Sequence, residues 1–260
     1  MTSTLSRVPS WALVLASLAF GAIVWETVGQ LGFSLIFPPL SDVMSTVYEV
    51  WTSERFRDAL TNTLTTLAIG WPLSVGLGLI VGTLMGRFKV VEWALDIYVN
   101  VFLSIPLIAT IPIILLLFGL GRPSIIVIVF MATFFQVVIN TSSGVRAVAA
   151  QYDEMARSFG ANEFQRMVRI TIPGALPLML TGIRIATGRC VRAVIFAEQI
   201  ISVIGLGGLL QSYGGALRVE ETWAIIIAIA IIGLTSMEIV RYLEGVMLRV
   251  FPQGHQISGA

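Results

Sequence analysis

The sequence has few of the residues that carry catalytic and metal chemistry. Among 260 residues there is one cysteine and one histidine. Cys190 lies alone in an apolar run, so it offers neither a disulfide within the chain nor a metal cluster. His255 lies in the tail after the last apolar stretch, where a solvated side chain is expected rather than a ligand or a base. These absences argue against a metal site and against histidine-dependent hydrolysis.

Charge is also scarce. Charged residues make up 12% of the chain and hydrophobic residues 56%, whereas soluble domains carry about 25% charged residues. The net charge of +1 comes from basic residues that are scattered rather than massed, which argues against a nucleic-acid partner. The composition therefore indicates a protein that is embedded in a membrane.

Long apolar runs divide the chain into spans. A hydrocarbon core of about 30 Å requires about 20 apolar residues per helix. Six stretches are long enough, at about 11–29, 60–86, 93–119, 122–145, 175–203 and 222–248. No composition shift marks a domain boundary, so residues 1–260 are predicted to form one all-α, polytopic transmembrane domain. No small-x-small cleavage site ends the first run, which favours a retained span over a signal peptide.

The distribution of the basic residues predicts how the chain is oriented in the membrane. With six spans, both termini lie on one side of the membrane. That side would hold Arg7, Arg87, Lys89, Arg146, Arg157, Arg166, Arg169 and Arg249. The other side would hold Arg55, Arg57, Arg122 and Arg218. The positive-inside rule then places both termini and the 146–173 loop in the cytoplasm.

Two segments on the outer side have patterns of their own. Pro38-Pro39 precedes apolar residues at helical spacing, which favours a helix on the membrane surface, with a plain connecting loop as the alternative. The 204–221 stretch is glycine-rich and has no Gly-Lys-Ser/Thr phosphate-loop sequence. It is interpreted as a flexible or re-entrant element, or as a linker.

The cytoplasmic 146–173 loop is predicted to form two short helices at an angle. Asp153 and Glu154 favour a helix start, and Met155 and Phe159 share a face. Gly160 is suited to the left-handed conformation that ends a helix.

The second predicted helix of the loop begins at Asn162, with Gln165 completing a capping box. Phe164 belongs to its apolar side, whereas Arg166 and Arg169 are expected to be exposed. Pro173 and Gly174 are expected to end it before the fifth span. Met155, Phe159 and Phe164 would then form knobs for a partner's groove, although an amphipathic loop resting on the membrane surface remains an alternative.

This loop resembles the E-A-A-x3-G-x9-I-x-L-P signature of ABC importer permeases. Glu154, Ala156, Gly160, Ile170 and Pro173 match it. Met155 stands where the signature has its middle alanine and Ile172 where it has leucine; both changes are apolar. Sequences that resemble the nitrate, sulfonate and taurine branch occur at 105–109, 143–146, 180–184, 188–189, 197–198 and 205–207.

The resemblance implies a type I importer. Two permease chains, here a homodimer by default, would surround a central path in the bacterial inner membrane. Two ATPase subunits would bind ATP and magnesium and receive the loop residues Glu154, Met155, Ala156, Phe159, Gly160, Phe164, Ile170 and Pro173. A periplasmic or lipid-anchored binding protein would deliver a small anionic solute. This chain would need no cofactor and catalyse nothing.

Polar residues inside the spans suggest where the path runs. Thr181, Arg192 and Gln199 form one stripe of the 175–203 helix, and Gln136 and Asn140 belong to a stripe of the 122–145 helix. Stripes opposed to aliphatic faces suggest helices lining a wet interior.

Two charged residues lie within the fifth span. Arg192 is the main candidate for contact with an anionic solute, with a structural ion pair or a helix–helix hydrogen bond as the alternative. Glu198 lies about 240° around the helix from Arg192, so the two should not pair along one helix. Glu198 is expected to meet a neighbouring helix, a second subunit, or Arg192 across the dimer axis. Arg184 and Arg189 are interpreted as snorkelling or loop-anchoring residues near the cytoplasmic end.

Two rival functions stay open at this stage. A stand-alone secondary transporter or channel would need carboxylates at the midplane, usually in repeated halves, and Glu198 is the one strong candidate. An intramembrane protease would need a histidine base or a paired-histidine motif, which a single tail histidine does not provide.

Overall fold

A computed structural model describes residues 10–32, 36–201 and 205–250, and within these ranges the chain is helical, with no strand. His255 and the last two residues of the predicted 175–203 span lie outside them. The helices in chain order are α1 (Ser10–Gln30), α2 (Leu40–Thr52), α3 (Glu54–Arg87), α4 (Lys89–Ser104), α5 (Leu107–Phe118), α6 (Arg122–Ser158), α7 (Glu163–Arg166), the π-helix η2 (Met167–Thr171), α8 (Ile172–Ile201), α9 (Leu206–Gly215) and α10 (Val219–Val250).

Five of the described helices are long and apolar enough to cross a membrane, and the bent pair α4–α5 would make a sixth span. The predicted span over 93–119 is therefore not one straight helix, because α4 and α5 meet at an angle of 104°. Pro106 explains the bend. A proline disfavours the helical conformation of the preceding residue, and Ile105 is extended with ψ 127°.

Small residues bring α3 and α6 together along much of their length. Gly70, Ser74, Gly78, Gly82 and Gly86 recur every four residues on one face of α3 and are all buried. A Cβ added at Gly86 would lie 2.6 Å from the Val145 Cβ, closer than real carbons approach. Such small-residue stripes let helix backbones pack closely where no hydrophobic effect drives association within lipid.

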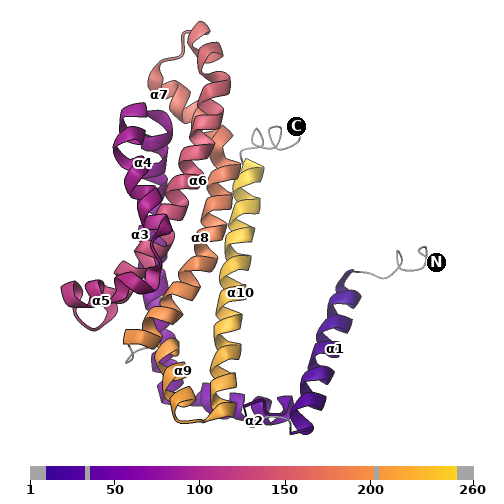
Figure 1. Cartoon of the computed structure of the whole chain (residues 1–260). Helices are drawn as coiled ribbons and strands as arrows, with labels where there is room; N and C mark the ends of the chain where they lie inside the picture. The colour runs from indigo at the N-terminus through magenta and orange to yellow at the C-terminus, as the bar shows by residue number, and fades with distance from the viewer. Residues whose placement is uncertain (1–9, 33–35, 202–204, 251–260) are drawn as a thin grey trace.

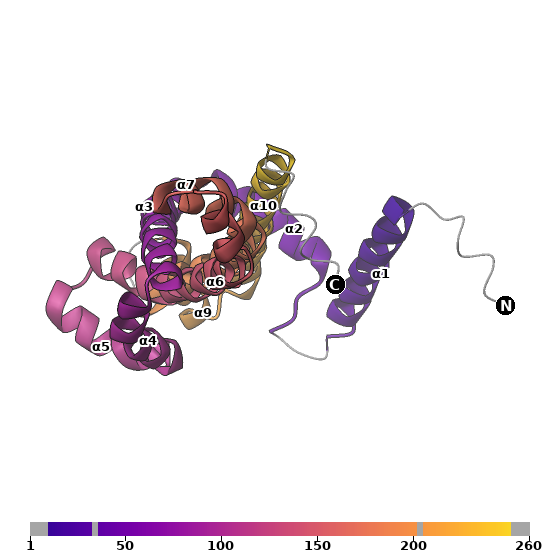
Figure 2. The same cartoon turned by 90° about the horizontal axis from the view of Figure 1, so that it is seen from above.

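The molecule has two distinct ends (Figure 1). The α7 end carries the tip of α6 and the loop that follows it, and the α9 end carries α9 and α2. The first residues of α1 and the last of α10 point toward the α7 end. Seen along the bundle, α3, α6 and α10 lie together, whereas α1 stands apart (Figure 2). Helix α8 packs against α3, α6 and α10.

Helix α2 runs across the base of the bundle (Figure 1), which agrees with the predicted surface helix rather than a plain loop. Val43, Val47 and Val50 are buried, and the Trp51 indole N–H donates to the Ala224 carbonyl at 3.1 Å. The start of α2 also holds α1, because the Ser41 backbone N–H donates to the Glu26 carboxylate at 3.0 Å.

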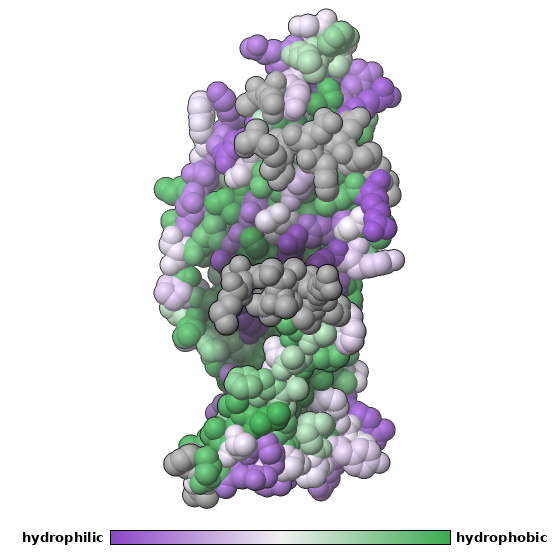
Figure 3. All heavy atoms as spheres, turned by 90° about the vertical axis from the view of Figure 1, so that its right-hand side faces the viewer, coloured by the Kyte–Doolittle hydropathy of each residue, from purple (hydrophilic) through white to green (hydrophobic). Residues whose placement is uncertain are grey.

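Helix α1 is almost entirely exposed along its apolar length. Its contact with the start of α10 is aromatic, since the Trp25 ring lies 4.8 Å from the Trp223 ring. Figure 3 shows hydrophobic residues covering much of the half toward the α9 end, above a hydrophilic base, and hydrophilic residues mixed among hydrophobic ones toward the α7 end. This distribution fits a protein embedded in a bilayer.

Candidate functional site: the loop end and the polar face of α8

Helix α6 continues without interruption from Arg122 to Ser158 and projects beyond the bundle to the α7 end (Figure 1). The first of the two predicted loop helices is therefore not a separate helix but the last turns of α6. No proline or other strong helix breaker lies between Val145 and Ser158, so the α6 hydrogen-bond ladder is not interrupted at the predicted span boundary.

Helix α6 ends in a Schellman motif. The Gly160 N–H donates to the Arg157 carbonyl at 2.9 Å, and the Ala161 N–H donates to the Ala156 carbonyl at 3.1 Å. Gly160 has φ +76°, the left-handed conformation predicted for it. The motif reverses the chain within a few residues and fixes the direction in which it leaves α6.

Large apolar side chains are exposed around this reversal. Phe159 is 85% exposed, Phe164 75% and Met155 52%. Glu154 is exposed beside them, whereas Ala156 is buried. The tip of α6 and the start of α7 thus present an apolar surface bounded by charge, with the side chains placed as the sequence predicted. We call Met155, Phe159 and Phe164 the loop-tip patch.

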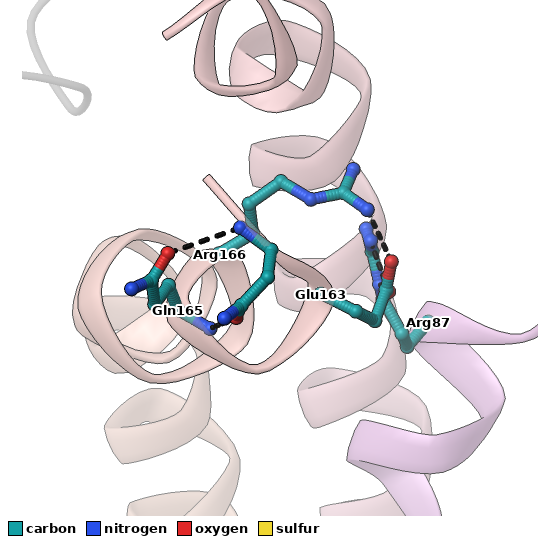
Figure 4. Close-up of polar contacts among 5 residues, drawn as sticks. Arg87, Glu163, Gln165 and Arg166 are labelled. Carbon is teal, nitrogen blue, oxygen red and sulfur yellow. Dashed lines mark hydrogen bonds and ion pairs between the residues drawn. The ribbon is translucent and has the colours of Figure 1, made fainter. Parts of the chain in front are cut away.

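Helix α7 begins at the predicted capping box. The Gln165 backbone N–H donates to the Asn162 side-chain oxygen at 2.8 Å, and the Asn162 backbone N–H donates to the Gln165 side-chain oxygen at 3.0 Å (Figure 4). These two bonds satisfy backbone donors that a helix start would otherwise leave open.

An ion cluster ties α7 to the end of α3 (Figure 4). The Glu163 carboxylate pairs with both Arg87, the last residue of α3, and Arg166. The expectation that Arg166 is exposed is wrong, since Arg166 pairs with Glu163 and is 6% exposed. Arg169 is exposed as predicted.

Pro173 and Gly174 do not end the second loop helix, which corrects that prediction. Helices α7 and α8 are joined by the π-helix Met167–Thr171, and the whole run from Glu163 to Ile201 is helical. Pro173 lacks the N–H that an α-helix interior needs, and a π-turn next to it changes the local hydrogen-bond register. Ile170 packs against the cluster of Val145, Val148, Ala175 and Met179, so the loop is joined to α6 and α8.

The predicted polar stripes lie partly at the contact between α6 and α8. Asn140 packs against Gly182, where an added Cβ would lie 2.6 Å from the Asn140 Cβ. The Asn140 amide donates to the Gln136 carbonyl at 2.8 Å, and the Thr181 hydroxyl donates to the Pro177 carbonyl at 2.8 Å. Gln199 is partly buried on α8.

Arg192 lies on the exposed face of α8 and lines a cavity of about 610 Å³ together with Arg189. Its Nε–H donates to the Gly188 carbonyl at 3.0 Å. The remaining walls come from α4, the α4–α5 bend, α5 and α6. From the sequence, Arg192 was predicted to contact the solute, whereas Arg189 was interpreted as a snorkelling or loop-anchoring residue near the cytoplasmic end.

Glu198 meets a neighbouring helix, one of the three partners considered for it. It is 1% exposed, and both carboxylate oxygens lie 2.9 Å from the Thr63 hydroxyl on α3. The carboxylate also accepts from the Gly207 N–H at 3.0 Å, and Thr63 accepts from the Leu206 N–H at 2.9 Å. The start of α9 is thereby bound to α3 and α8, so this glycine-rich stretch is an anchored helix rather than a linker.

The contact between α8 and α10 was not anticipated. Arg184 pairs with Glu244 of α10, its Nε–H donating at 3.1 Å, and is thus an interhelical residue rather than a snorkelling one. In the sequence, Thr63 and Glu244 could be recognised only as polar residues inside apolar runs. That pattern does not indicate which residue each of them contacts.

Comparison with known proteins identifies the class. Residues 74–247 match the family described as the inner membrane component of binding-protein-dependent transport systems. The chain belongs to this family. The family match covers α3 from Ser74 through most of α10, and hence both the loop and the polar face of α8.

Relatives at the level of sequence include permeases of ABC importers. The chain is 30% identical over 228 residues to the putative aliphatic sulfonates transport permease SsuC of Bacillus subtilis, covering 87% of this chain and 83% of the relative. It is 33% identical to the taurine permease TauC of Escherichia coli, covering 85% and 82%. It is 29% identical to the nitrate import permease NrtB of Synechocystis, covering 71% and 67%.

Solved structures show the same fold. The MetNI methionine ABC transporter in an inward-facing conformation superposes with a TM-score of 0.62 at 18% identity, covering 75% of this chain and 99% of that one. An amino acid ABC transporter superposes at 0.56 and 21% identity, covering 79% and 96%. The chain is thus an all-α, multi-pass ABC importer permease, as the loop signature implied.

Proposed function

We propose that this permease works as a pair of identical chains with two copies of an ABC ATPase and an external solute-binding protein. It lies in the bacterial inner membrane with both termini in the cytoplasm. ATP and magnesium bind to the ATPase, and this chain catalyses no reaction itself. ATP-driven closure of the ATPases moves the loops and opens the path outward.

The loop-tip patch is the observation that carries the proposal. Phe159 and Phe164 are large, apolar and mostly exposed at the α7 end, beyond the bundle (Figure 1). An apolar anchor outside the bilayer is stabilised by a pocket on another protein. Glu154, Met155, Ala156, Gly160, Ile170 and Pro173 are assigned to shaping and supporting this surface.

The loop is suited to transmit force because it is tied to three spans. The Schellman motif joins it to α6, Glu163 joins it to Arg87 of α3, and the helical run through η2 joins it to α8. A displacement of Phe159 and Phe164 would therefore shift several helices together rather than bend a free loop.

The solute path is assigned to the polar face of α8 and the adjoining face of α6. Arg192, Gln199 and Thr181 lie on α8, and Gln136 and Asn140 lie on α6. Glu198 is assigned to holding the start of α9 beside this path, given its bonds to Thr63 and Gly207. The relatives named for sulfonates, taurine and nitrate support a small anionic solute.

The test is a Phe159→Ala/Phe164→Ala double variant. It removes two anchors that touch little in this chain, so the bundle should stay folded while the ATPase is lost. Truncating interface anchors weakens binding by about 2–4 kcal/mol each. We expect the variant to co-purify with at least tenfold less ATPase and to lose ATP-dependent uptake in proteoliposomes.

The matched control is Leu217→Ala, which removes another large apolar side chain that is 81% exposed but lies at the α9 end. It should retain ATPase and uptake. A double variant that keeps full ATPase stoichiometry and normal uptake would contradict the docking role of the loop-tip patch.

A further inference from the structure

Two guanidinium groups line one cavity on the exposed face of α8, beside the α4–α5 bend. Arg189 and Arg192 are three residues apart on α8 and share a face. The cavity measures about 610 Å³ and contains no carboxylate among its lining residues. Its other walls are apolar and include Phe102, Ile105, Ile108, Met131 and Phe196.

Both arginines lie deep in α8. At 1.5 Å per residue, Arg192 is about 14 Å and Arg189 about 18 Å from the end of α8 at Ile201. Positions at that depth lie well inside a hydrocarbon core about 30 Å thick. A charged residue there costs about 2.5–3.5 kcal/mol on insertion scales unless a partner or water compensates it.

Two other arginines within the bundle have carboxylate partners, whereas Arg189 and Arg192 have none among the described residues. Arg184 pairs with Glu244, and Arg146 pairs with Glu92. Among the described residues, neither Arg189 nor Arg192 has a carboxylate within ion-pair distance. Glu198, the one acidic residue of α8, is already engaged by Thr63 and Gly207.

The chemistry of the cavity fits one kind of occupant. Two guanidiniums on one face can donate several hydrogen bonds to the oxygens of a single sulfonate or carboxylate. The surrounding aromatic and aliphatic walls would contact an apolar body attached to that group. A bare inorganic anion such as nitrate would satisfy the guanidiniums but leave the apolar walls without a contact.

We propose that the Arg189–Arg192 cavity is a binding site on the transport path for an organic anion, with an oxyanion head on the two guanidiniums and an apolar body against Phe102, Ile108 and Phe196. This inference rests on the proposed function and narrows its substrate class. The site lies at the α4–α5 bend, so a change of the 104° angle between these helices would open or close it.

The experiment measures anion binding to the purified permease–ATPase complex in an uncharged detergent, without the external binding protein. Isothermal titration compares benzenesulfonate, its uncharged analogue benzenesulfonamide, and nitrate. We expect benzenesulfonate to bind, nitrate to bind at least tenfold more weakly, and benzenesulfonamide not to bind. Arg189→Gln and Arg192→Gln should each weaken benzenesulfonate binding about tenfold or more, since each removes hydrogen bonds to a charged group.

The matched control is the double variant Arg184→Gln/Glu244→Gln, which removes both charges of the ion pair between α8 and α10 and should bind benzenesulfonate normally. Equal binding of the sulfonate and the sulfonamide, or unchanged binding by both arginine variants, would overturn the proposal. So would a result in which added phosphatidylglycerol, and not benzenesulfonate, occupied the cavity.

Anion binding and ATPase co-purification test the anion site and the proposed function separately. Failure of sulfonate binding in a complex that still co-purifies with its ATPase would overturn the anion site alone. Absence of any ATPase from the purified complex would contradict the proposed function, whatever the cavity binds.

Discussion

Replacing Gly160 by valine is expected to reduce ATP-dependent uptake at least tenfold while leaving the membrane bundle folded. Gly160 has φ +76°, where a β-branched residue is strained by about 1–2 kcal/mol or more. No atom of this chain lies within 4 Å of an added Cβ, so the strain falls on the Schellman motif and not on the core. Relaxing that strain would redirect the chain between Phe159 and Phe164 and separate the two anchors.

The control for this variant is Gly245→Val. Gly245 is also open around an added Cβ, but it lies inside α10 with ordinary helical backbone angles. Uptake, ATPase co-purification and thermal unfolding in detergent are measured for both. Normal uptake by Gly160→Val would show that the geometry of the reversal is not needed for coupling.

Replacing Gly207 by alanine should have the largest effect on stability. An added Cβ would lie 2.2 Å from the Ile195 carbonyl oxygen and 2.7 Å from the Glu198 Cβ, and neither atom can move freely. Overpacking of this kind costs about 1–3 kcal/mol, and displacing the Gly207 N–H from the Glu198 carboxylate adds about 1.5–3 kcal/mol. We expect a fall of about 10 °C in the melting temperature, with loss of uptake as α9 leaves its place.

Gly214→Ala is the control on the same helix, because nothing lies within 4 Å of its added Cβ. It should unfold as the unaltered protein does, or slightly later, since alanine favours a helix. Protease sensitivity of α9 reports whether the helix has detached. A Gly207→Ala protein with unchanged melting and an intact α9 would contradict the role given to the Glu198–Thr63 contact.

Local features of this protein were predictable because local chemistry determines them. Asn162 and Gln165 form a capping box within four residues, and Gly160 ends α6 by a conformation that few other residues adopt. Exposure of Phe159 and Phe164 followed from their place in a polar loop between spans. The same short-range pattern carries the family signature.

Long-range contacts were not predictable from one sequence. Arg166 is buried at a cluster in which Glu163 also pairs with Arg87, 76 residues away from Glu163 in the chain. The place of Glu198 depends on Thr63, 135 residues away. The effects of two prolines on the backbone were not predicted. Pro106 lies at a bend inside a predicted span, whereas Pro173 lies inside a continuous helix next to a π-turn.

The most direct test of the account is cysteine crosslinking at the loop-tip patch. Cys190 is the one cysteine of the chain. In a Cys190→Ala background, Phe159→Cys or Phe164→Cys therefore supplies the one thiol of the permease. The account predicts that a short bifunctional reagent joins this thiol to the ATPase subunit, and that an impermeant maleimide reaches it only from the cytoplasmic side. A thiol that reacts from the exterior, or stays fully accessible and uncrosslinked in the assembled transporter, would contradict the docking of this loop on an ATPase.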